Sequence, residues 1–378
     1  MREVKDLVRK NILKFKPYKA GKPIKEVQRE LGLKRIIKLA SNENPLGPSL
    51  LALRAIKKSL SNINRYPDGN CFYLKRKLAE RLNIQPSNII FGNGSNEIIE
   101  LIIKTFLNEG EEVIMSKPDF LIFRLATLQE NGLPIEVDLK DFCCNLGAIK
   151  EAITPKTKII FIANPNNPIG SYVREEEIRG FIEEVPDNIL IVLDEAYYEF
   201  AKDEKGYPDS LKFLDKKNVI ILRTFSKAYG LAGLRLGYGL ANEEVIDYLN
   251  NSRQPFNVNY LAQIAGEAAL DDDRFLQKTL RIIEEGKRYL YKELDRLGLS
   301  YIKSATNFIL IDIKGNSKKL FDKMLAEGVI VREMSTYGLD SWIRVTIGTR
   351  NENERFIETF ERFMEGGVID NCIKTRCN

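Results

Sequence analysis

Short apolar runs alternate with amphipathic helical stretches along most of this 378-residue chain, and this alternation constrains the fold more than any other feature. Most of the runs lack polar alternation, as expected of parallel strands that are covered on both faces. They include Asn88–Phe91, Glu112–Met115, Pro134–Val137, Lys158–Ala163, Ile189–Leu193, Val219–Thr224 and Leu236–Leu240. Helical patterns such as Ser95–Phe106 and Arg174–Glu184 separate them. Strands joined through helices imply right-handed crossovers, so we predict an α/β fold.

The pattern changes after about residue 243. It becomes helical through Ala262–Leu270 and Phe275–Leu297, which predicts a long helical link. Apolar runs then return at Phe308–Ile313, Val329–Arg332 and Trp342–Ile347, with the helical pattern Ser317–Glu327 between them. We therefore predict an N-terminal arm with part of a small domain over 1–45, a large α/β domain over 46–265, and a small α+β domain over 266–378.

Histidine is absent from the chain, which excludes every mechanism that needs an imidazole. If the chain is an enzyme, its proton transfers must then use Lys, Tyr, Asp, Glu or a cofactor. The five cysteines are odd in number and form no CxxC pair, so neither a zinc site nor a disulfide framework is indicated. We predict reduced thiols, no metal and a cytoplasmic location, because the chain also shows no secretory leader and no run of 18 apolar residues.

The first 38 residues are basic, with 13 Lys and Arg against 4 Asp and Glu. A basic arm suits nucleic acid, but Val4, Leu7, Val8 and Ile12 recur at helical spacing. We therefore predict an amphipathic helix that packs on its own protein and turns a basic face to solvent, with no nucleic-acid or membrane partner.

Four polar motifs follow predicted strands, at the edge where open α/β sheets bind ligands. In the first, Phe91–Glu97 leads from a strand into a helix, so the amides of Gly94, Ser95 and Asn96 suit an anion at the helix N-terminus. The motif fits neither GxGxxG nor the P-loop pattern. A plain turn with a helix cap is the alternative interpretation.

The second and third motifs follow the predicted strands Lys158–Ala163 and Ile189–Leu193. Asn164–Gly170 reads NPNNPIG, and a structural turn explains its prolines and glycine but not its three asparagines. Asp194–Tyr197 places two carboxylates at the end of a buried strand, where each needs a cationic or hydrogen-bonding partner. A structural ion pair is the alternative to a functional role there.

The fourth motif runs from Thr224 to Lys227, followed by Gly230, Gly233 and Arg235. A lysine at a crowded strand end near an arginine suits a desolvated amine beside a bound anion. Together the motifs offer an amine, a buried carboxylate, Tyr and Asn donors, and amides, hydroxyls and an arginine for a phosphate. This is the polar inventory of a pyridoxal phosphate site.

The segments NPNNPIG, DEAYYEF and TFSKAYGLAGLRLGY resemble the fold-type I, aspartate-aminotransferase-like superfamily. LASNENPLGPS, NRYPDGNCFYLKRKLAE and VREMSTYGLDSWIRVTIGTR are similar to the histidinol-phosphate aminotransferase family. The resemblance implies a large domain around a mostly parallel seven-stranded sheet, a smaller α+β domain, and pyridoxal 5'-phosphate as cofactor. It also implies transamination between L-histidinol phosphate and 2-oxoglutarate, giving imidazole acetol phosphate and L-glutamate, in histidine biosynthesis.

The resemblance assigns roles to matching positions. Lys227 would bond to the cofactor and move a proton between the substrate α-carbon and the cofactor's C4′. Asp194 would pair with the pyridinium nitrogen, and Asn167 and Tyr197 would hydrogen-bond the phenolate oxygen. Phe120 would stack on the ring. The cofactor phosphate would be held by Gly94, Ser95, Asn96, Thr224, Ser226 and Arg235.

The same resemblance also implies which residues hold the substrate and that two chains share each active site. Arg332 and Arg344 would hold the substrate phosphate, with Tyr18 near it. Tyr66 would reach the cofactor phosphate of a neighbouring subunit, which implies a homodimer. Two alternatives of the same fold stay open, namely threonine-phosphate decarboxylase and an aromatic amino-acid aminotransferase.

Overall fold

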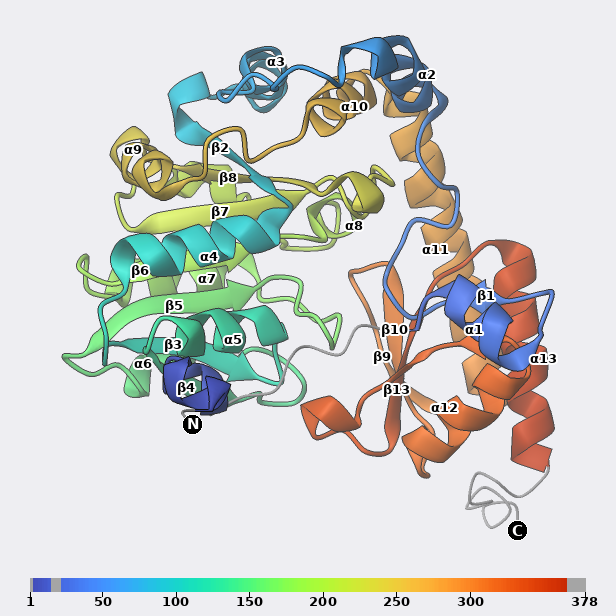
Figure 1. Cartoon of the computed structure of the whole chain (residues 1–378). Helices are drawn as coiled ribbons and strands as arrows, with labels where there is room; N and C mark the ends of the chain where they lie inside the picture. The colour runs from blue at the N-terminus through green and yellow to red at the C-terminus, as the bar shows by residue number, and fades with distance from the viewer. Residues whose placement is uncertain (1–2, 15–21, 366–378) are drawn as a thin grey trace.

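The computed structural model describes residues 3–14 and 22–365, and its largest element is a seven-stranded sheet of order β2-β8-β7-β6-β5-β3-β4 (Figure 1). β8 pairs antiparallel with both β2 and β7, and the remaining pairs are parallel. The strands are β2 Ile89–Asn93, β3 Glu112–Lys117, β4 Leu133–Asp138, β5 Thr157–Ala163, β6 Leu190–Asp194, β7 Val219–Thr224 and β8 Leu236–Ala241. Every strand predicted for this region is present, and the predicted fold class is confirmed.

Helices cover both faces of this sheet. Ile159 and Phe161 of β5 pack in one apolar cluster with α4 (Ser95–Phe106), α5 (Leu121–Gln129) and α9 (Glu243–Ser252). Ile160 and Ile162 of the same strand point to the other face, toward α3 (Phe72–Leu82), α6 (Leu146–Glu151), α7 (Glu175–Glu184) and α10 (Tyr260–Leu270). Because both faces are buried, β5 carries apolar residues at successive positions from Ile159 to Ala163.

A second, antiparallel sheet has the order β12-β13-β10-β9 and its own apolar core. Its strands are β9 Ser300–Ile302, β10 Phe308–Asp312, β12 Arg332–Glu333 and β13 Trp342–Thr346. The long helix α11 (Asp273–Arg296) runs toward it from the large sheet, and α12 (Ser317–Ala326) and α13 (Arg350–Glu365) lie around it (Figure 1).

The N-terminal segment joins this smaller part, because β1 (Ile37–Lys38) pairs parallel with β11 (Val329–Ile330). The predicted apolar run Val329–Arg332 is divided between two short strands. β11 and β12 belong to different sheets, since Val329 and Ile330 are buried beside β1 while half-buried Arg332 pairs with β13. The domain limits at residues 45 and 265 stay a prediction.

The first described residues do not form the predicted amphipathic helix. They form two single turns of 3-10 helix, Val4–Leu7 and Ile12–Lys14, and the side chains of Val4 and Leu7 are each 77% exposed. Asn11 anchors the segment by donating to the carbonyls of Leu128 (3.0 Å) and Gln129 (2.7 Å). Helices this short are marginal unless an apolar face is buried, and these side chains bury little here.

The remaining helices in the described ranges are α1 (Ile24–Leu31), α2 (Leu50–Ser59) and the one-turn α8 (Tyr198–Ala201), besides short 3-10 turns. α2 packs on α10, at the end of the large sheet where α3 also lies (Figure 1). Within the described residues, no helix has the length and apolarity to cross a bilayer. The same residues contain no cluster of three or more side chains suited to a metal ion.

Candidate active site

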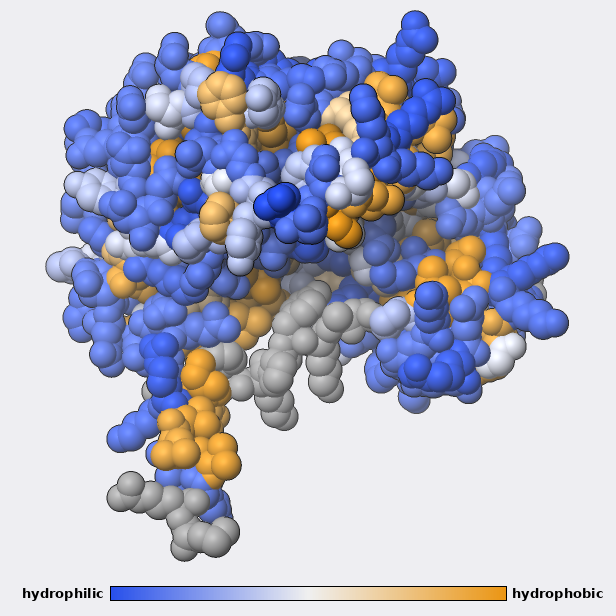
Figure 2. Space-filling model, turned by 45° about the horizontal axis from the view of Figure 1, so that its top comes forward, coloured by the Kyte–Doolittle hydropathy of each residue, from blue (hydrophilic) through white to orange (hydrophobic). Residues whose placement is uncertain are grey.

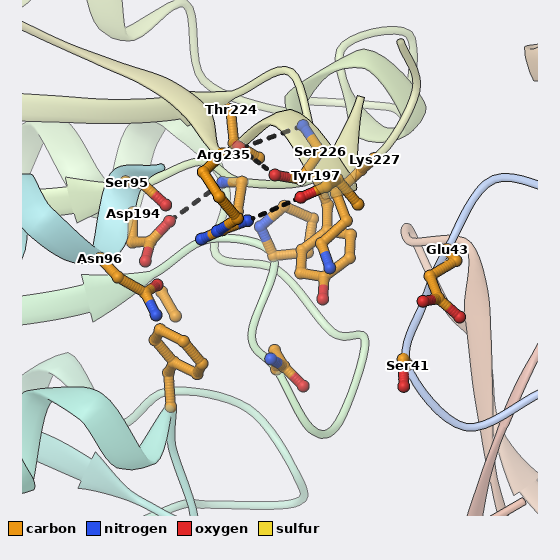
Figure 3. Close-up of a pocket in the computed structure, with 16 residues that line it drawn as sticks. Ser41, Glu43, Ser95, Asn96, Asp194, Tyr197, Thr224, Ser226, Lys227 and Arg235 are labelled. Carbon is orange, nitrogen blue, oxygen red and sulfur yellow. Dashed lines mark hydrogen bonds between the residues drawn. The ribbon is translucent and has the colours of Figure 1, made fainter. Parts of the chain in front are cut away.

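A cavity of about 250 Å³ lies where β5, β6 and β7 end and α4 begins, with the segment around Ser41 and Glu43 on its opposite side (Figure 3). The predicted residues that line it are Ser95, Asn96, Phe120, Asn167, Asp194, Tyr197, Thr224, Ser226, Lys227 and Arg235. Gly94 adjoins it as the residue before α4. The fold thus brings the four motifs together, because the carboxyl ends of parallel strands meet at one edge of a sheet.

One end of the cavity is built to receive an anion. Gly94 has φ +79°, and a Cβ placed there would lie 2.4 Å from Nη2 of Arg235. A Cβ on Gly237 would lie 2.3 Å from the backbone nitrogen of Ser95. Only glycine at these two positions lets the guanidinium and β8 approach the first turn of α4, whose amides carry the positive end of the helix dipole.

Two hydroxyl groups complete this end. Thr224 Oγ1 accepts the backbone N–H of Ser226 at 3.1 Å and lies 3.0 Å from Ser226 Oγ. With Ser95 and Arg235 they offer the donors and the positive charge that a phosphate monoester requires.

Asp194, the last residue of β6, is the buried carboxylate of the site. It accepts the backbone N–H of Ala196 at 3.1 Å, and the structure shows no ion pair to it from any described residue. Burial raises the pKa of Asp194 to about 7, against the lowering effect of the Ala196 N–H. A carboxyl group held this way gains from a cationic partner in the cavity, and the protonated nitrogen of a pyridine ring is such a partner.

The neighbouring carboxylate has a structural role instead. Glu195 forms an ion pair with Arg223 at 2.8 Å, and both side chains are fully buried. The Arg223 guanidinium also stacks on the Tyr198 ring, 3.4 Å from its centroid. The structural ion pair considered for this motif therefore applies to Glu195 and not to Asp194.

Lys227 follows β7, and its amine lies 5.6 Å from the centroid of the Tyr197 ring. Burial, together with the charges of Arg344 and Arg235, lowers the pKa of Lys227 to about 8, against the raising effect of Glu43. A larger share of this amine is therefore neutral near pH 7 than for an ordinary lysine, which makes it a better nucleophile.

The three asparagines of the second motif have different roles. Asn164 bonds both backbone polar groups of Val173, and Asn166 donates to Asp119 at 3.2 Å, so both hold the loop. Asn167 lines the cavity, and its Oδ1 accepts from Arg344. This bond leaves the amide nitrogen of Asn167 to donate into the cavity.

Arg344 lies on β13 and is buried, and it also donates to the carbonyl of Ala40 at 3.1 Å. Arg332 on β12 is directly opposite Arg344 in the strand register, and neither arginine is among the residues that line the cavity. Tyr66 is 83% exposed outside the cavity and stacks on Phe256, with 4.8 Å between ring centroids. Tyr18 lies outside the described residues.

Sequence reasoning did not assign three residues of one segment. Ser41 and Glu43 line the cavity, and Asn42 between them donates to the Tyr197 hydroxyl at 2.8 Å. Their signal was the polar run in LASNENPLGPS, which served only to support the resemblance.

Comparison with known proteins agrees with this architecture. The family model described as aminotransferase class I and II matches residues 34–360. Histidinol-phosphate aminotransferase of Moorella thermoacetica is 48% identical over 94% of this chain and 92% of its own. Histidinol-phosphate aminotransferase 2 of Carboxydothermus hydrogenoformans is 46% identical over 95% of this chain and 99% of its own. Among solved structures, this chain superposes with a TM-score of 0.89 on the crystal structure of the Sinorhizobium meliloti histidinol-phosphate aminotransferase in complex with pyridoxal-5'-phosphate. The two sequences are 27% identical, and the match covers 95% of this chain and 98% of the other.

The two-sheet fold with a lysine cavity at the strand ends is that of the class I and II aminotransferases. The chain belongs to this family and, within it, to the histidinol-phosphate aminotransferases. It is an aminotransferase.

Proposed function

We propose that this aminotransferase transfers the amino group of L-histidinol phosphate to 2-oxoglutarate, using pyridoxal 5'-phosphate, in histidine biosynthesis. The products are imidazole acetol phosphate and L-glutamate. One observation carries the proposal: a single cavity joins a buried lysine, a carboxylate without a cationic partner and an anion cradle. We also propose a cytoplasmic location, since Cys71, Cys143 and Cys144 are free thiols, as is usual in a reducing compartment.

The residues present fit the cofactor. Ser95, Asn96, Thr224, Ser226 and Arg235, with Gly94 giving access, would hold its phosphate. Asp194 would keep the ring nitrogen protonated, the Asn167 amide and the Tyr197 hydroxyl would donate to the phenolate oxygen, and Phe120 would lie against the ring. When bound, the cofactor supplies a ring that accepts electron density from the substrate α-carbon.

Lys227 would carry out the proton transfers. Its amine would bond the cofactor before substrate binds and, once released, would move a proton between the substrate α-carbon and C4′. Because its pKa is lowered to about 8, the amine can both accept and return a proton near neutral pH. This assignment accounts for an enzyme without histidine.

Arg332 and Arg344 support a phosphorylated substrate. Directly opposite residues of an antiparallel pair project from the same face, so these two positive charges lie close together. Paired guanidinium groups can bind a doubly charged phosphate through several charge-assisted hydrogen bonds. The Nε of Arg344 is buried and has no partner among the described residues, which adds one donor for an incoming anion.

The substrate test measures the spectral change of the cofactor in single turnovers with histidinol phosphate, histidinol, phenylalanine and threonine phosphate. Histidinol phosphate should react best. Arg332→Gln should weaken its binding about ten- to a hundredfold, from the loss of one charge-assisted hydrogen bond of ~1.5–3 kcal/mol. Arg29→Gln, on exposed α1, makes the same charge change away from the cavity and should not weaken it.

Other outcomes identify the alternatives. Release of carbon dioxide from threonine phosphate would indicate the decarboxylase, and equal rates with phenylalanine would indicate a broad aromatic aminotransferase. An Arg332→Gln protein that binds histidinol phosphate as tightly as the unaltered protein would reject the arginine pair as a phosphate site.

We propose that the enzyme is a homodimer in which Tyr66 reaches the cofactor phosphate of the partner. Two observations support this: Tyr66 is exposed and does not line its own cavity, and apolar side chains are exposed on the neighbouring helices α2 and α3. Figure 2 shows apolar patches on the face of the molecule that is at the top of Figure 1. The exposed apolar side chains of this α2–α3 face include Leu50, Leu51, Leu53, Leu60, Ile63, Phe72 and Tyr73. An exposed patch of this kind is typical of a protein interface.

Mixed dimers test the shared site. A dimer of one Tyr66→Phe chain and one Lys227→Ala chain contains one cavity with both changes and one with neither. It should therefore be about as active as one unaltered site. If the two chains act independently, the Tyr66→Phe change instead lies in the cavity that retains Lys227, and activity stays at the level of a Tyr66→Phe site.

A further inference from the structure

Asn42 is the centre of a buried hydrogen-bond network that reaches the cavity. It is 2% exposed and has φ +55°, a backbone conformation that asparagine tolerates better than most residues. Its Nδ2 donates to the Tyr197 hydroxyl at 2.8 Å, and its backbone N–H donates to Thr346 Oγ1 at 2.9 Å. Its carbonyl accepts from Asn307 at 3.0 Å. The network thus connects Tyr197, which lies shortly after β6, with the small antiparallel sheet.

The direction of these bonds decides what the Tyr197 hydroxyl can do. Thr346 Oγ1 donates to Asn42 Oδ1 at 3.2 Å, so this oxygen is already used and the amide nitrogen faces Tyr197. An amide nitrogen can only donate, and the Tyr197 oxygen must therefore accept. The proton of the hydroxyl is left for a different acceptor.

Tyr197 keeps that proton at any physiological pH. Burial raises the pKa of Tyr197 to about 12, while Arg344 and Asn42 oppose the rise. The charged and titratable groups around it are Arg344 from β13, Asp194 at the end of β6 and Lys227 after β7, with Tyr337 from the turn before β13. Figure 3 shows Tyr197 beside Lys227 at the cavity. The hydroxyl is thus a fixed donor at the cavity wall.

We propose that Asn42 is a positioning residue: by donating to the Tyr197 oxygen, it commits the Tyr197 proton to the phenolate oxygen of the bound cofactor. The inference rests on the proposed function, because it requires pyridoxal phosphate in the cavity. A donor at the phenolate oxygen draws charge from it and weakens its hold on a proton shared with the neighbouring imine nitrogen. Asn42 therefore helps to set the pH at which the bound cofactor loses that proton.

Asn42→Asp tests the direction of the bond. Aspartate has nearly the same shape and tolerates positive φ, but its ionised carboxylate can only accept. Tyr197 must then donate to residue 42 and not to the cofactor. The pH midpoint of the cofactor's absorbance change, measured without substrate, should rise by about one unit, as expected for a lost hydrogen bond to a charged group.

Asn42→Gly is the matched control. Glycine adopts the same φ without strain and leaves the Tyr197 proton uncommitted, so the midpoint should move by less than about a third of the aspartate shift. In a Tyr197→Phe background, Asn42→Asp should shift the midpoint much less than it does with Tyr197 present. This second comparison removes the direct effect of the new negative charge, since that effect persists without the tyrosine hydroxyl.

An equal shift in the aspartate and glycine variants, or the same aspartate shift with and without the tyrosine hydroxyl, would overturn the inference. If the aspartate variant does not fold, Thr346→Val replaces it. That change removes the hydrogen-bond donor to Asn42 Oδ1, so the side-chain amide of Asn42 is free to turn and accept from Tyr197. The pH midpoint should then also rise. An unaltered protein that shows no cofactor absorbance band at all would refute the proposed function, whereas a band insensitive to both changes refutes only the role of Asn42.

Discussion

Replacing Gly94 by alanine tests whether the cavity end around α4 is a phosphate site. The new Cβ would lie 2.4 Å from Arg235 Nη2, which is closer than such atoms approach, so the flexible guanidinium must move away from the helix. The Arg235 contact with a bound phosphate is then lost. A charge-assisted hydrogen bond is worth ~1.5–3 kcal/mol, and the dissociation constant of pyridoxal phosphate should rise about ten- to a hundredfold.

The comparison with pyridoxal, which lacks the phosphate, locates the effect. Its affinity should change less than about threefold, because no group of pyridoxal needs Arg235. Gly233→Ala lies in the same segment as Arg235, has no neighbour within 4 Å of the new Cβ and no positive φ, so it should bind both ligands normally. Equal losses for pyridoxal phosphate and pyridoxal in Gly94→Ala would refute the assignment of this end to the phosphate.

The same change has a second, independent consequence. Gly94 has φ +79° and ψ 165°, a combination that is essentially restricted to glycine and costs other residues about 1–3 kcal/mol. The cofactor-free Gly94→Ala protein should therefore lose this much free energy of unfolding in a urea titration. The strain precedes any ligand, so this loss should appear whether or not the phosphate assignment is correct.

Two further predictions concern the neighbouring carboxylates. Because burial raises the pKa of Asp194 to about 7, the folded cofactor-free protein holds a proton there that the unfolded chain releases near pH ~4, and the stability from this proton is lost as the pH rises between the two values. The free energy of unfolding of cofactor-free Asp194→Asn should therefore exceed that of the unaltered apoprotein by roughly 1–4 kcal/mol at pH 8 and by much less at pH 5. Thermal unfolding at both pH values measures this difference. A stability difference of the same size at pH 5 and pH 8 would contradict the prediction. Glu195→Ala should instead destabilise the protein at both pH values by about 3–5 kcal/mol, because Arg223 would remain buried without its ion-pair partner; a loss below 1 kcal/mol in urea unfolding would contradict a structural role.

The large sheet was predictable from the sequence because burial on both faces makes its strands apolar at successive positions, as in β5 and β6. α4 was predicted with the same limits that the structure shows, since its apolar side chains repeat at helical spacing. The prediction of an amphipathic helix around Val4 was wrong, because the spacing of apolar residues does not show whether a surface exists to bury them. The apolar run Val329–Arg332 did not show its division into β11 and β12, because two strands in different sheets can follow each other without a break in the pattern.

The candidate site was predictable to the extent that its residues follow strands. Lys227, Asp194 and Asn167 all lie within a few residues of a strand end, so the chain pattern alone places them at one edge of the sheet. Glu43 and Asn42 belong to a segment without periodicity that reaches the cavity only through pairing with the small sheet. Contacts of this kind depend on tertiary structure, which local patterns do not encode.

The contrast between Asp194 and Glu195 shows how burial separates structure from chemistry at one strand end. Both carboxylates are buried, yet Glu195 has the Arg223 guanidinium and Asp194 has only a backbone N–H. The cavity shows the same imbalance elsewhere, because Lys227 is buried among positive groups and its pKa is lowered. A single ligand with a cationic ring nitrogen, a carbonyl carbon and a phosphate would relieve both imbalances and neutralise Arg235. In the cofactor-free protein, the buried Asp194 carboxyl lacks a cation and the buried Lys227 amine lies near positive charges, and both arrangements are unfavourable. A ligand that relieves both on binding is favoured over molecules that carry only one of its groups.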